Sequence, residues 1–288
     1  MIGWVDALLQ GLLLGGLYAL FALGLSLMFG VMRLVNIAHG DLIILASFAG
    51  YALAAGAGTG PWLALLALGP LAFAAGYALQ RGVLNRTLGR DILPPLLVTF
   101  GLSIVVQNLL LEVFSADSRS IPGGGIETAS LPLAPGLALG WLPLLILATA
   151  LGATAGLEWC FGRTALGRAL RATADDRDTA GLMGIDARHV YALATGLALV
   201  LVAVAGVFHG LRTTIAPTDG PAQLLYAFEA VVIGGLGSFW GTLAGGLILG
   251  VAQSVGFRLD PGWGLLVGHG VFLVVLVARP TGLFARTR

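Results

Sequence analysis

The sequence of 288 residues contains no lysine, and only 10% of its residues are charged. A P-loop needs a lysine that reaches the β- and γ-phosphates of the bound nucleotide, so this chain cannot be a P-loop ATPase by itself. Its formal net charge of +1 gives no sign of a nucleic-acid partner. The lack of lysine thus excludes one large class of protein before any motif is considered.

Cysteines and metal-binding patterns are also scarce. Cys160 is the single cysteine, so no disulfide forms within the chain, and we interpret it as a small buried apolar residue. The four histidines (39, 189, 209 and 269) are scattered, with no HExxH or CxxC spacing. Residues 101–104 (GLSI) begin like the nucleophile turn of a serine hydrolase but lack its second glycine. We therefore expect no catalytic residue, no metal site and no cofactor.

Apolar residues make up 58% of the sequence, and the mean hydropathy is +0.95. They gather in runs of about 20 residues, the length that crosses a bilayer as a helix. Only Asp6 is charged in the first run, which lacks the basic start of a cleaved signal peptide. We predict one all-α domain over 1–288, a polytopic transmembrane helical bundle of about eight hydrophobic segments. The segments are 7–30, 40–57, 62–80, 92–114, 139–160, 190–211, a broken stretch at 226–256, and 264–278.

Glycine is abundant, with 44 residues, and several glycines are spaced four apart. Such a pair leaves two gaps on one helix face, so that a neighbouring backbone can approach closely. We expect these pairs to support tight bundling and to say little about chemistry. The pairs are Gly11/Gly15, Gly152/Gly156, Gly241/Gly245, Gly246/Gly250 and Gly264/Gly268.

The broken stretch contains a glycine-rich interruption at 234–238. Residues 229–235 are too few to cross a membrane at about 1.5 Å per residue, and a helix resumes over 241–256. Glu229 would sit near the N-terminus of the first piece, where the helix dipole favours an acid. We favour a re-entrant pair of half-helices beside a translocation pathway, because irregular backbone at membrane depth needs protein or water around it. A kinked helix that spans fully is the alternative.

The arginines orient the array through the positive-inside rule. With the loop at 161–189 in the cytoplasm and a re-entrant stretch, twelve arginines lie inside, among them Arg90, Arg286 and Arg288. Three arginines, at 119, 212 and 258, then lie outside, whereas a fully spanning stretch gives ten inside and five outside. We predict that the N-terminus and the Gly- and Pro-rich loop at about 115–138 lie outside, and that the C-terminus is cytoplasmic.

The loop at about 161–189 carries five arginines and four aspartates between apolar segments. Residues 165–174 (ALGRALRATA) favour a helix. Asp175 can cap a second short helix, with Asp178 in the capping-box position and Gly184 as its stop. Leu182 and Met183 supply a small apolar face. Mixed charge around an apolar knob suits docking into a groove of a soluble protein. The alternative is a pair of helices that lie among anionic lipid headgroups.

Polar side chains at membrane depth are costly, so each is a candidate for the pathway. We select Asn36, His39, Gln107 and Glu229; for Asn36 and His39, helix capping and interhelical hydrogen bonds are an equal alternative. For Glu112, His209 and Glu229 the alternative is a position near the outer headgroups. Asn108 neighbours Gln107, and the two cannot face the same way, so at most one of them lines a pathway.

Three stretches resemble the permease subunits of branched-chain amino acid ABC importers. They are 24–51 (GLSLMFGVMRLVNIAHGDLIILASFAGY), 167–190 (GRALRATADDRDTAGLMGIDARHV) and 229–250 (EAVVIGGLGSFWGTLAGGLILG). The sequence RPTGLF at 279–284 fits the family as well. The resemblance extends in order over the whole chain and is closest to the first of the two paired permeases. Asp41 stands where glutamate is common in the family, which is a conservative departure.

The resemblance implies a multi-pass subunit of the bacterial inner membrane, surrounded by membrane lipid. It implies a second related permease, two P-loop ATPases that use the ATP, and a periplasmic or lipid-anchored binding protein. Residues 167–186 would be the ATPase contact, and Asn36 to Asp41 would lie near the cytoplasmic side of the pathway. The contact residues we select are Gly167, Arg168, Arg171, Asp175, Asp176 and Gly184.

The substrate is less closely determined than the class of transporter. Leucine, isoleucine and valine lead, but related permeases also handle other amino acids, short amides and urea, so a urea or amide permease is one alternative. An ion-coupled secondary transporter is another, because such proteins also contain broken helices. It would need a buried acid, such as Glu112 or Glu229, as its coupling site.

Overall fold

A computed structural model describes residues 2–56, 58–88, 93–134 and 137–284. Most of them are helical, which confirms the predicted helical bundle. Within the described residues, seven stretches are long and apolar enough to cross a membrane, and two shorter apolar helices accompany them. The long helices are α1 (Ile2–Met32), α3 (Pro61–Gly82), α4 (Leu93–Phe114), α5 (Trp141–Arg163), α8 (Ala187–Arg212) and α10 (Phe239–Leu259).

Shorter helices complete the bundle and its loops. The helix α2 (His39–Tyr51) continues into a π-helical turn, η1 (Ala52–Gly56), and together they form the seventh span. A 3-10 turn, η2 (Leu84–Arg86), follows α3. The remaining helices are α6 (Ala165–Asp175), α7 (Arg177–Leu182), α9 (Gly220–Gly234) and α11 (Trp263–Ala278).

One small antiparallel sheet lies in a region that we expected to be an irregular loop. The strands β1 (Ser130–Ala134) and β2 (Leu137–Gly140) pair with Ser130 opposite Gly140. Because residues 137–140 belong to this hairpin, α5 begins at Trp141 rather than at 139. The strands have only five and four residues, too few for a clear alternation of apolar and polar side chains.

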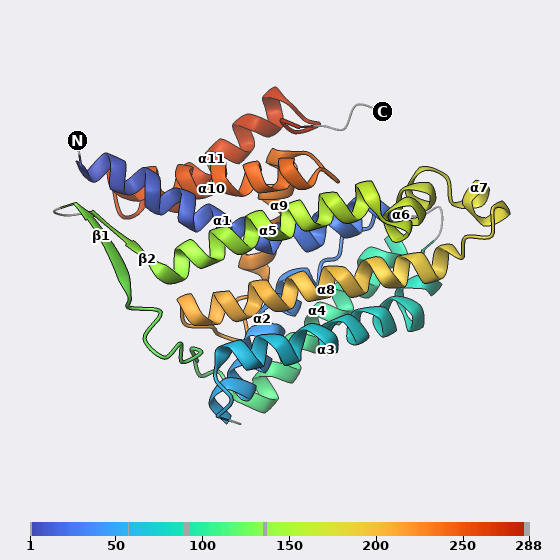
Figure 1. Ribbon diagram of the computed structural model, residues 1–288, viewed down its shortest axis with the longest axis horizontal. Helices are drawn as coiled ribbons and strands as arrows, with labels where there is room; N and C mark the ends of the chain where they lie inside the picture. Colours follow the sequence, from blue (N-terminus) through green and yellow to red (C-terminus); the bar gives the residue numbers. More distant parts are fainter. Residues whose placement is uncertain (1, 57, 89–92, 135–136, 285–288) are drawn as a thin grey trace.

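The molecule has two ends, each of which carries a loop (Figure 1). One end carries the N-terminus and the β-hairpin, and we call it the hairpin side; the other carries α6 and α7, and we call it the charged-loop side. Trp and Tyr concentrate at the two interfaces of a membrane. Exposed tryptophans occur at both levels: Trp4, Trp62, Trp141 and Trp263 begin helices at the hairpin side, and Trp159 and Trp240 lie near the charged-loop side.

The helices α1 to α4 and α8 to α11 form two units of the same design that run in opposite directions. In each unit a long helix is followed by an extended segment, then by a helix that starts inside the bundle, and then by two more helices. The packing repeats as well: α1 packs on α10 as α8 packs on α3, and α1 packs on α9 as α8 packs on α2. Likewise α2 packs on α4 as α9 packs on α11. This is an inverted-topology repeat.

The two units meet at their centres. The helices α1 and α8, the most buried of the long helices, pack on each other, and so do α2 and α9. The first turn of α2 touches the first turn of α9, where a Cβ built on Gly40 would overlap the carbonyl oxygen of Gly220. His39 lies beside the carbonyl oxygen of Phe21, eleven residues before α1 ends. Residues 36–41 therefore lie inside the bundle rather than at its charged-loop end.

The glycine-rich interruption is a turn between two antiparallel helices. Gly234 of α9 faces Gly241 of α10, and Ala230 faces Gly245, so the chain reverses at residues 235–238. This turn lies on the charged-loop side, where Gly237 approaches Gly30 near the end of α1. The two helices are therefore not a pair of half-helices that turns at membrane depth: α9 has 15 residues, whereas α10 has 21 and is long enough to span.

The placement of Glu229 at a helix N-terminus was wrong. The helix α9 begins at Gly220, with Pro221 in its first turn, and Glu229 lies in its middle. Proline at the start of a helix is favourable because the missing N–H would have no partner there. The predicted start, near residue 226, overlooked this signal because residues 220–225 are less apolar than those that follow.

Four of the five predicted glycine pairs lie at helix crossings. Gly11 and Gly15 of α1 pack against Gly246 and Gly250 of α10, and this contact joins the two units. The pair Gly241/Gly245 meets α9, and Gly264/Gly268 meets side chains of α10. A Cβ at Gly152 or Gly156 of α5 would meet no atom within 4 Å, so this pair supports no contact within the described chain.

Candidate functional site

The charged loop begins with α6, which is held tightly against the end of α5. The Thr164 hydroxyl caps α6 by accepting a hydrogen bond from the Gly167 N–H at 3.0 Å. Gly167 packs on the backbone of Cys160 and Phe161, where a side chain would collide with the Cys160 carbonyl oxygen. Leu170 and Thr173 are buried on the same face of α6. Gly167 is thus needed for the close contact between α6 and α5, and this contact fixes the position of the rest of the loop.

The cap of α7 is Asp176, so the prediction of Asp175 was wrong by one residue. Asp175 ends α6, and the Asp176 carboxylate accepts hydrogen bonds from the N–H groups of Asp178 and Thr179 and from the Thr179 hydroxyl. The hydroxyl bond first, and the two N–H bonds with it, lower the pKa of Asp176. An ionised cap is therefore favoured on this short helix.

Gly184 ends α7 as predicted. Its φ of 82° is left-handed, a conformation that costs glycine little. The Gly184 N–H donates to the Gly181 carbonyl, and the Ile185 N–H donates to the Ala180 carbonyl. These two bonds form a Schellman motif, which satisfies carbonyls at the end of the helix. The motif turns the chain sharply and leaves α7 at the tip of the loop.

The tip of the loop combines exposed apolar side chains with free charges. Leu182 and Met183 are 88% and 79% exposed, which is unusual for large apolar side chains. Arg163, Arg168 and Arg177 are exposed and Arg171 is half-buried. None of these arginines, nor the three aspartates at 175, 176 and 178, forms an ion pair with another described residue. A face of this kind has the composition of a protein-docking surface.

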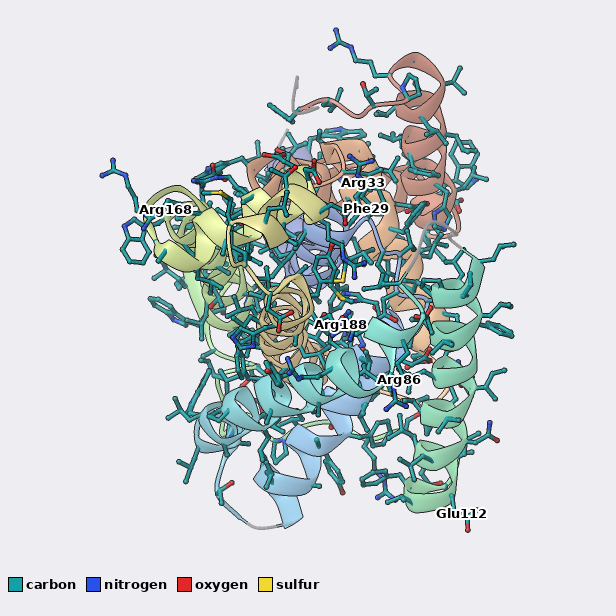
Figure 2. The ribbon with its side chains drawn as sticks, turned by 90° about the vertical axis from the view of Figure 1, so that its right-hand side faces the viewer. Phe29, Arg33, Arg86, Glu112, Arg168 and Arg188 are labelled. Atoms are coloured by element: carbon teal, nitrogen blue, oxygen red, sulfur yellow. The ribbon has the colours of Figure 1, made fainter. Side chains whose placement is uncertain are left out.

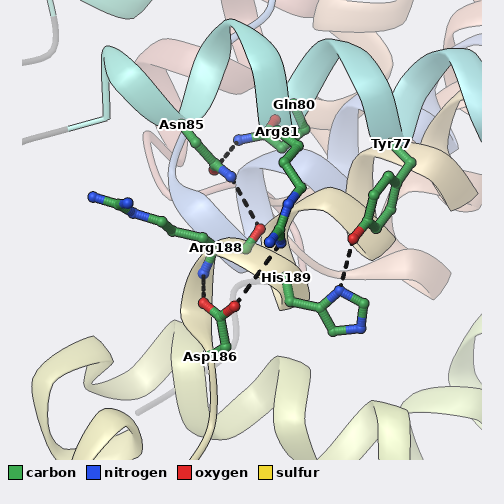
Figure 3. Close-up of polar contacts among 7 residues, drawn as sticks. All are labelled: Tyr77, Gln80, Arg81, Asn85, Asp186, Arg188 and His189. Atoms are coloured by element: carbon green, nitrogen blue, oxygen red, sulfur yellow. Dashed lines mark hydrogen bonds and ion pairs between the residues drawn. The ribbon is translucent and has the colours of Figure 1, made fainter.

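The far end of the loop is tied to α3 and η2 (Figure 3). The Asn85 amide donates to the Arg188 carbonyl at 3.0 Å, and the Tyr77 hydroxyl lies 2.9 Å from Nδ1 of His189. Asp186 caps α8 and lies 3.9 Å from Nη1 of Arg81. Because residues 186–189 lead into α8 and are held on α3, a displacement of the loop would reach both repeat units.

Arginines gather on the charged-loop side. Figure 2 looks onto this end, with Arg33, Arg86, Arg168 and Arg188 labelled. Among the described residues, nine arginines lie on this side and three, Arg119, Arg212 and Arg258, lie towards the hairpin side. The predicted inside residues Arg90, Arg286 and Arg288 lie outside the described residues.

The first group of pathway candidates gathers around the start of α2. Asn36, His39 and Asp41 are almost fully buried. Nε2 of Gln107, on α4, donates to Oδ1 of Asp41 at 2.8 Å, whereas Asn108 is exposed. Gln107 thus faces the bundle and Asn108 faces away from it, and a place for Gln107 on a pathway stays a prediction. The Asn36 side chain accepts a hydrogen bond from the Ala38 N–H, but the N-cap of α2 is Ala38 and the helix has no side-chain cap.

The second group surrounds Glu229, which is 1% exposed. Nδ1 of His269, on α11, lies 2.6 Å from Oε1 of Glu229. The ring of Tyr226 stacks on those of His269 and Tyr18. His209 is also buried, in the last turn of α8, whereas Glu229 lies in the middle of α9. Glu112, in contrast, is exposed near the end of α4 (Figure 2).

Sequence reasoning missed two members of this neighbourhood. Tyr18 lies in a uniformly apolar run, and we counted Arg212 only as an outside arginine. The structure buries the Tyr18 hydroxyl against Gln253 at 2.6 Å, and Nη1 of Arg212 is buried without a hydrogen-bond partner among the described residues. No cluster of three metal-binding side chains occurs in the described part of the chain.

Known proteins resemble the chain along nearly its whole length. Residues 7–276 match the family described as "Branched-chain amino acid transport system / permease component". The chain is 31% identical to the high-affinity branched-chain amino acid transport system permease protein BraD of Pseudomonas aeruginosa, with 98% of this chain and 96% of that protein covered. It is 30% identical to the corresponding protein LivH of Escherichia coli, with the same coverage. It is also 25% identical to LivM of Escherichia coli, over 94% of this chain and 68% of LivM.

Proposed function

This chain belongs to the family of permease components of branched-chain amino acid transport systems, and we propose that it carries leucine, isoleucine or valine across the bacterial inner membrane as a subunit of an ABC importer. The observation that carries the proposal is the match to the family from residue 7 to residue 276. The multi-pass helical bundle and the exposed docking loop agree with it.

A second permease completes the membrane part of the importer. Escherichia coli LivH and LivM are both named as permease proteins of a high-affinity branched-chain amino acid transport system, and this chain resembles both. It is nearer to LivH in identity and in coverage. We therefore assign it the place of the first permease, beside a related second one.

Two P-loop ATPases would drive the transport from the charged-loop side. The chain has no lysine for a P-loop of its own, and its exposed tip, with Leu182 and Met183, supplies a knob for a groove on a soluble partner. When the ATPases close on nucleotide, they would draw the loop with them. The loop's attachments to α5 and α3 would then tip the permease pair from inward- to outward-facing, through contacts that differ between the two states.

The described arginines support the orientation in the membrane that we propose. Nine of the twelve lie on the charged-loop side, which the positive-inside rule assigns to the cytoplasm. The N-terminus and the β-hairpin then face the periplasm, where a substrate-binding protein would deliver the amino acid. The C-terminal segment is cytoplasmic, because α11 ends beside the turn after α9.

Reconstitution tests the proposal. The tagged chain is purified in mild detergent from its native membrane, co-purifying proteins are identified by mass spectrometry, and the complex is placed in proteoliposomes with its binding protein. We expect a related permease, P-loop ATPases, and leucine uptake that requires ATP and the binding protein and is inhibited by isoleucine and valine. Uptake of urea but of no amino acid would overturn the substrate. Ion-driven transport by the chain alone would overturn the class.

A further inference from the structure

Seven polar or aromatic side chains converge between α1, α8, α9, α10 and α11. The Tyr18 hydroxyl donates to Oε1 of Gln253 at 2.6 Å, and the Tyr18 ring stacks on Tyr226 with 4.8 Å between centroids. The ring of Tyr226 is parallel to that of His269, which contacts Glu229. We call this group the Arg212–Glu229 cluster. Its members are Tyr18, His209, Arg212, Tyr226, Glu229, Gln253 and His269.

The cluster holds opposite charges that do not neutralise each other. The Arg212 guanidinium and the Glu229 carboxylate both lie close enough to the Tyr18 hydroxyl to act on it electrostatically. Among the described residues, Arg212 forms no ion pair within 4.0 Å, and Glu229 pairs only with His269, through one of its two oxygens. A positive and a negative group thus both lie near one tyrosine.

Most unpartnered polar atoms of the bundle belong to this cluster. In the described part of the chain, nine buried side-chain nitrogen or oxygen atoms lack a hydrogen-bond partner. Five of the nine are in the cluster: both ring nitrogens of His209, Nη1 of Arg212, Oε2 of Glu229 and Nε2 of Gln253. Buried polar atoms are normally bonded, because burial removes their water. Five such atoms, with donors and an acceptor among them, indicate a place built to bind a polar molecule.

The cluster extends from the middle of the bundle towards the hairpin side. Tyr18 follows Trp4 by fourteen residues, or about 21 Å along α1 at 1.5 Å per residue. Gln253 lies six residues before α10 ends, and His209 and Arg212 lie in the last turn of α8, which ends at the hairpin side. The Tyr18–Gln253 pair lies where the two inverted units contact each other, since α1 and α10 belong to different units.

We propose that the Arg212–Glu229 cluster binds the charged backbone of the transported amino acid during its passage. Arg212, with His209, would receive the α-carboxylate, because a guanidinium presents paired donors that match a carboxylate. Oε2 of Glu229 would accept from the α-ammonium group. Such a site accepts leucine, isoleucine and valine alike, since all three share these two groups, and it leaves choice among side chains to the binding protein.

The inference rests on the proposed function and adds where the substrate is held. The test uses the complete importer without its binding protein, so that any binding must be to the membrane complex. Thermal unfolding of this chain is followed with increasing leucine, with leucinamide, which lacks the carboxylate, and with 4-methylpentanoate, which lacks the ammonium group. Stabilisation by a ligand rises with its concentration relative to its Kd.

We expect leucine to stabilise the chain, and the two analogues to do so only at concentrations about 30-fold higher or more, since each leaves one buried charge unpaired. Arg212→Gln and Glu229→Gln should weaken the leucine effect by a similar factor, and Arg212→Lys should weaken it less. Glu112→Gln, which removes an exposed acid outside the cluster, should leave the effect unchanged.

Equal stabilisation by leucine and both analogues would overturn the inference, and so would an unchanged leucine effect in both glutamine variants. Because the wild-type comparison of the three ligands needs no variant, misfolding of a variant cannot hide the answer. If the wild-type complex imports leucine but shows no stabilisation, the cluster is not a binding site while the proposed function stands. If it imports no amino acid, the proposed function itself fails.

Discussion

Gly167 of α6 lies so close to Cys160 of α5 that a side chain on Gly167 would overlap the Cys160 carbonyl oxygen. This contact places the docking loop rigidly on the end of a membrane-spanning helix. A single methyl group on Gly167 would disturb the position of the loop, so the coupling role that we propose for it can be tested directly.

We predict that Gly167→Ala impairs transport while the protein still inserts in the membrane. The methyl group would force α6 away from α5, and overpacking of this kind costs about 1–3 kcal/mol. ATP hydrolysis by the reconstituted complex should persist with less substrate moved per ATP. Gly162→Ala is the matched control, because a Cβ there meets no atom within 4 Å. Equal transport by the two variants would show that the crossing does not matter for coupling.

The exposed knob gives a second prediction. Met183→Asp should weaken binding of the ATPases by about tenfold or more, as expected when a central apolar contact of an interface is lost. Leu131→Asp changes a partly exposed leucine on the hairpin side and should leave ATPase binding intact. The measurement is the amount of ATPase that co-purifies with each variant. Full recovery with Met183→Asp would favour the alternative in which the loop lies among lipid headgroups.

Asp176 allows its capping role to be separated from a role in docking. Asp176→Ser keeps a side-chain cap, whereas Asp176→Ala removes it, so only the alanine variant should loosen α7 if capping is what matters.

Reversing the charge at Arg171 or at Asp176 should uncouple ATP hydrolysis from transport without abolishing membrane insertion. Unchanged coupling in both reversed variants would remove the loop from the mechanism.

The pH dependence of the same cap has a definite sign. Hydrogen bonds to the Asp176 carboxylate, first from the Thr179 hydroxyl, lower its pKa in the folded loop. The cap therefore stabilises α7 fully above the ordinary aspartate pKa of about 4 and loses this effect as the pH falls through the lowered value. Asp176 should therefore cause no pH dependence in the amount of substrate moved per ATP between about pH 6 and pH 8. A step in this range that disappears in Asp176→Ser would contradict the assignment.

The sequence predicted the features of this fold that depend on neighbouring residues. It did not predict the features that depend on residues far apart in the sequence. Each span was visible as an apolar run, and Gly184 was recognisable as a helix stop because both depend on neighbouring residues. The inverted repeat was missed, since related packing can be kept with different apolar side chains. The meeting of Tyr18, Arg212 and Glu229 depends on how α9 folds back between helices far apart in sequence, which no local pattern records.

The orientation is tested by chemical labelling from one side of the membrane. In a Cys160→Ala background, Met183→Cys and Leu133→Cys each place one thiol at an exposed position, on opposite sides of the bundle. A membrane-impermeant maleimide added to intact spheroplasts should label Cys at position 133 and should reach position 183 only after permeabilisation. The reverse pattern would place the charged loop outside, where cytoplasmic ATPases cannot reach it.

The junction of the two repeat units gives the last prediction. Gly40 of α2 touches the carbonyl oxygen of Gly220 at the start of α9, so Gly40→Ala should separate the two helices or prevent them from meeting. Since α2 and α9 come from different units, any change between inward- and outward-facing states has to pass this contact. We expect Gly40→Ala to reduce leucine uptake at least about tenfold, the effect of an overpacking cost near 1.4 kcal/mol. Gly69→Ala, which meets open space on α3, should transport normally. Normal uptake by Gly40→Ala would mean that the units move without passing through this contact, and the pathway would then have to be sought away from the α2–α9 junction.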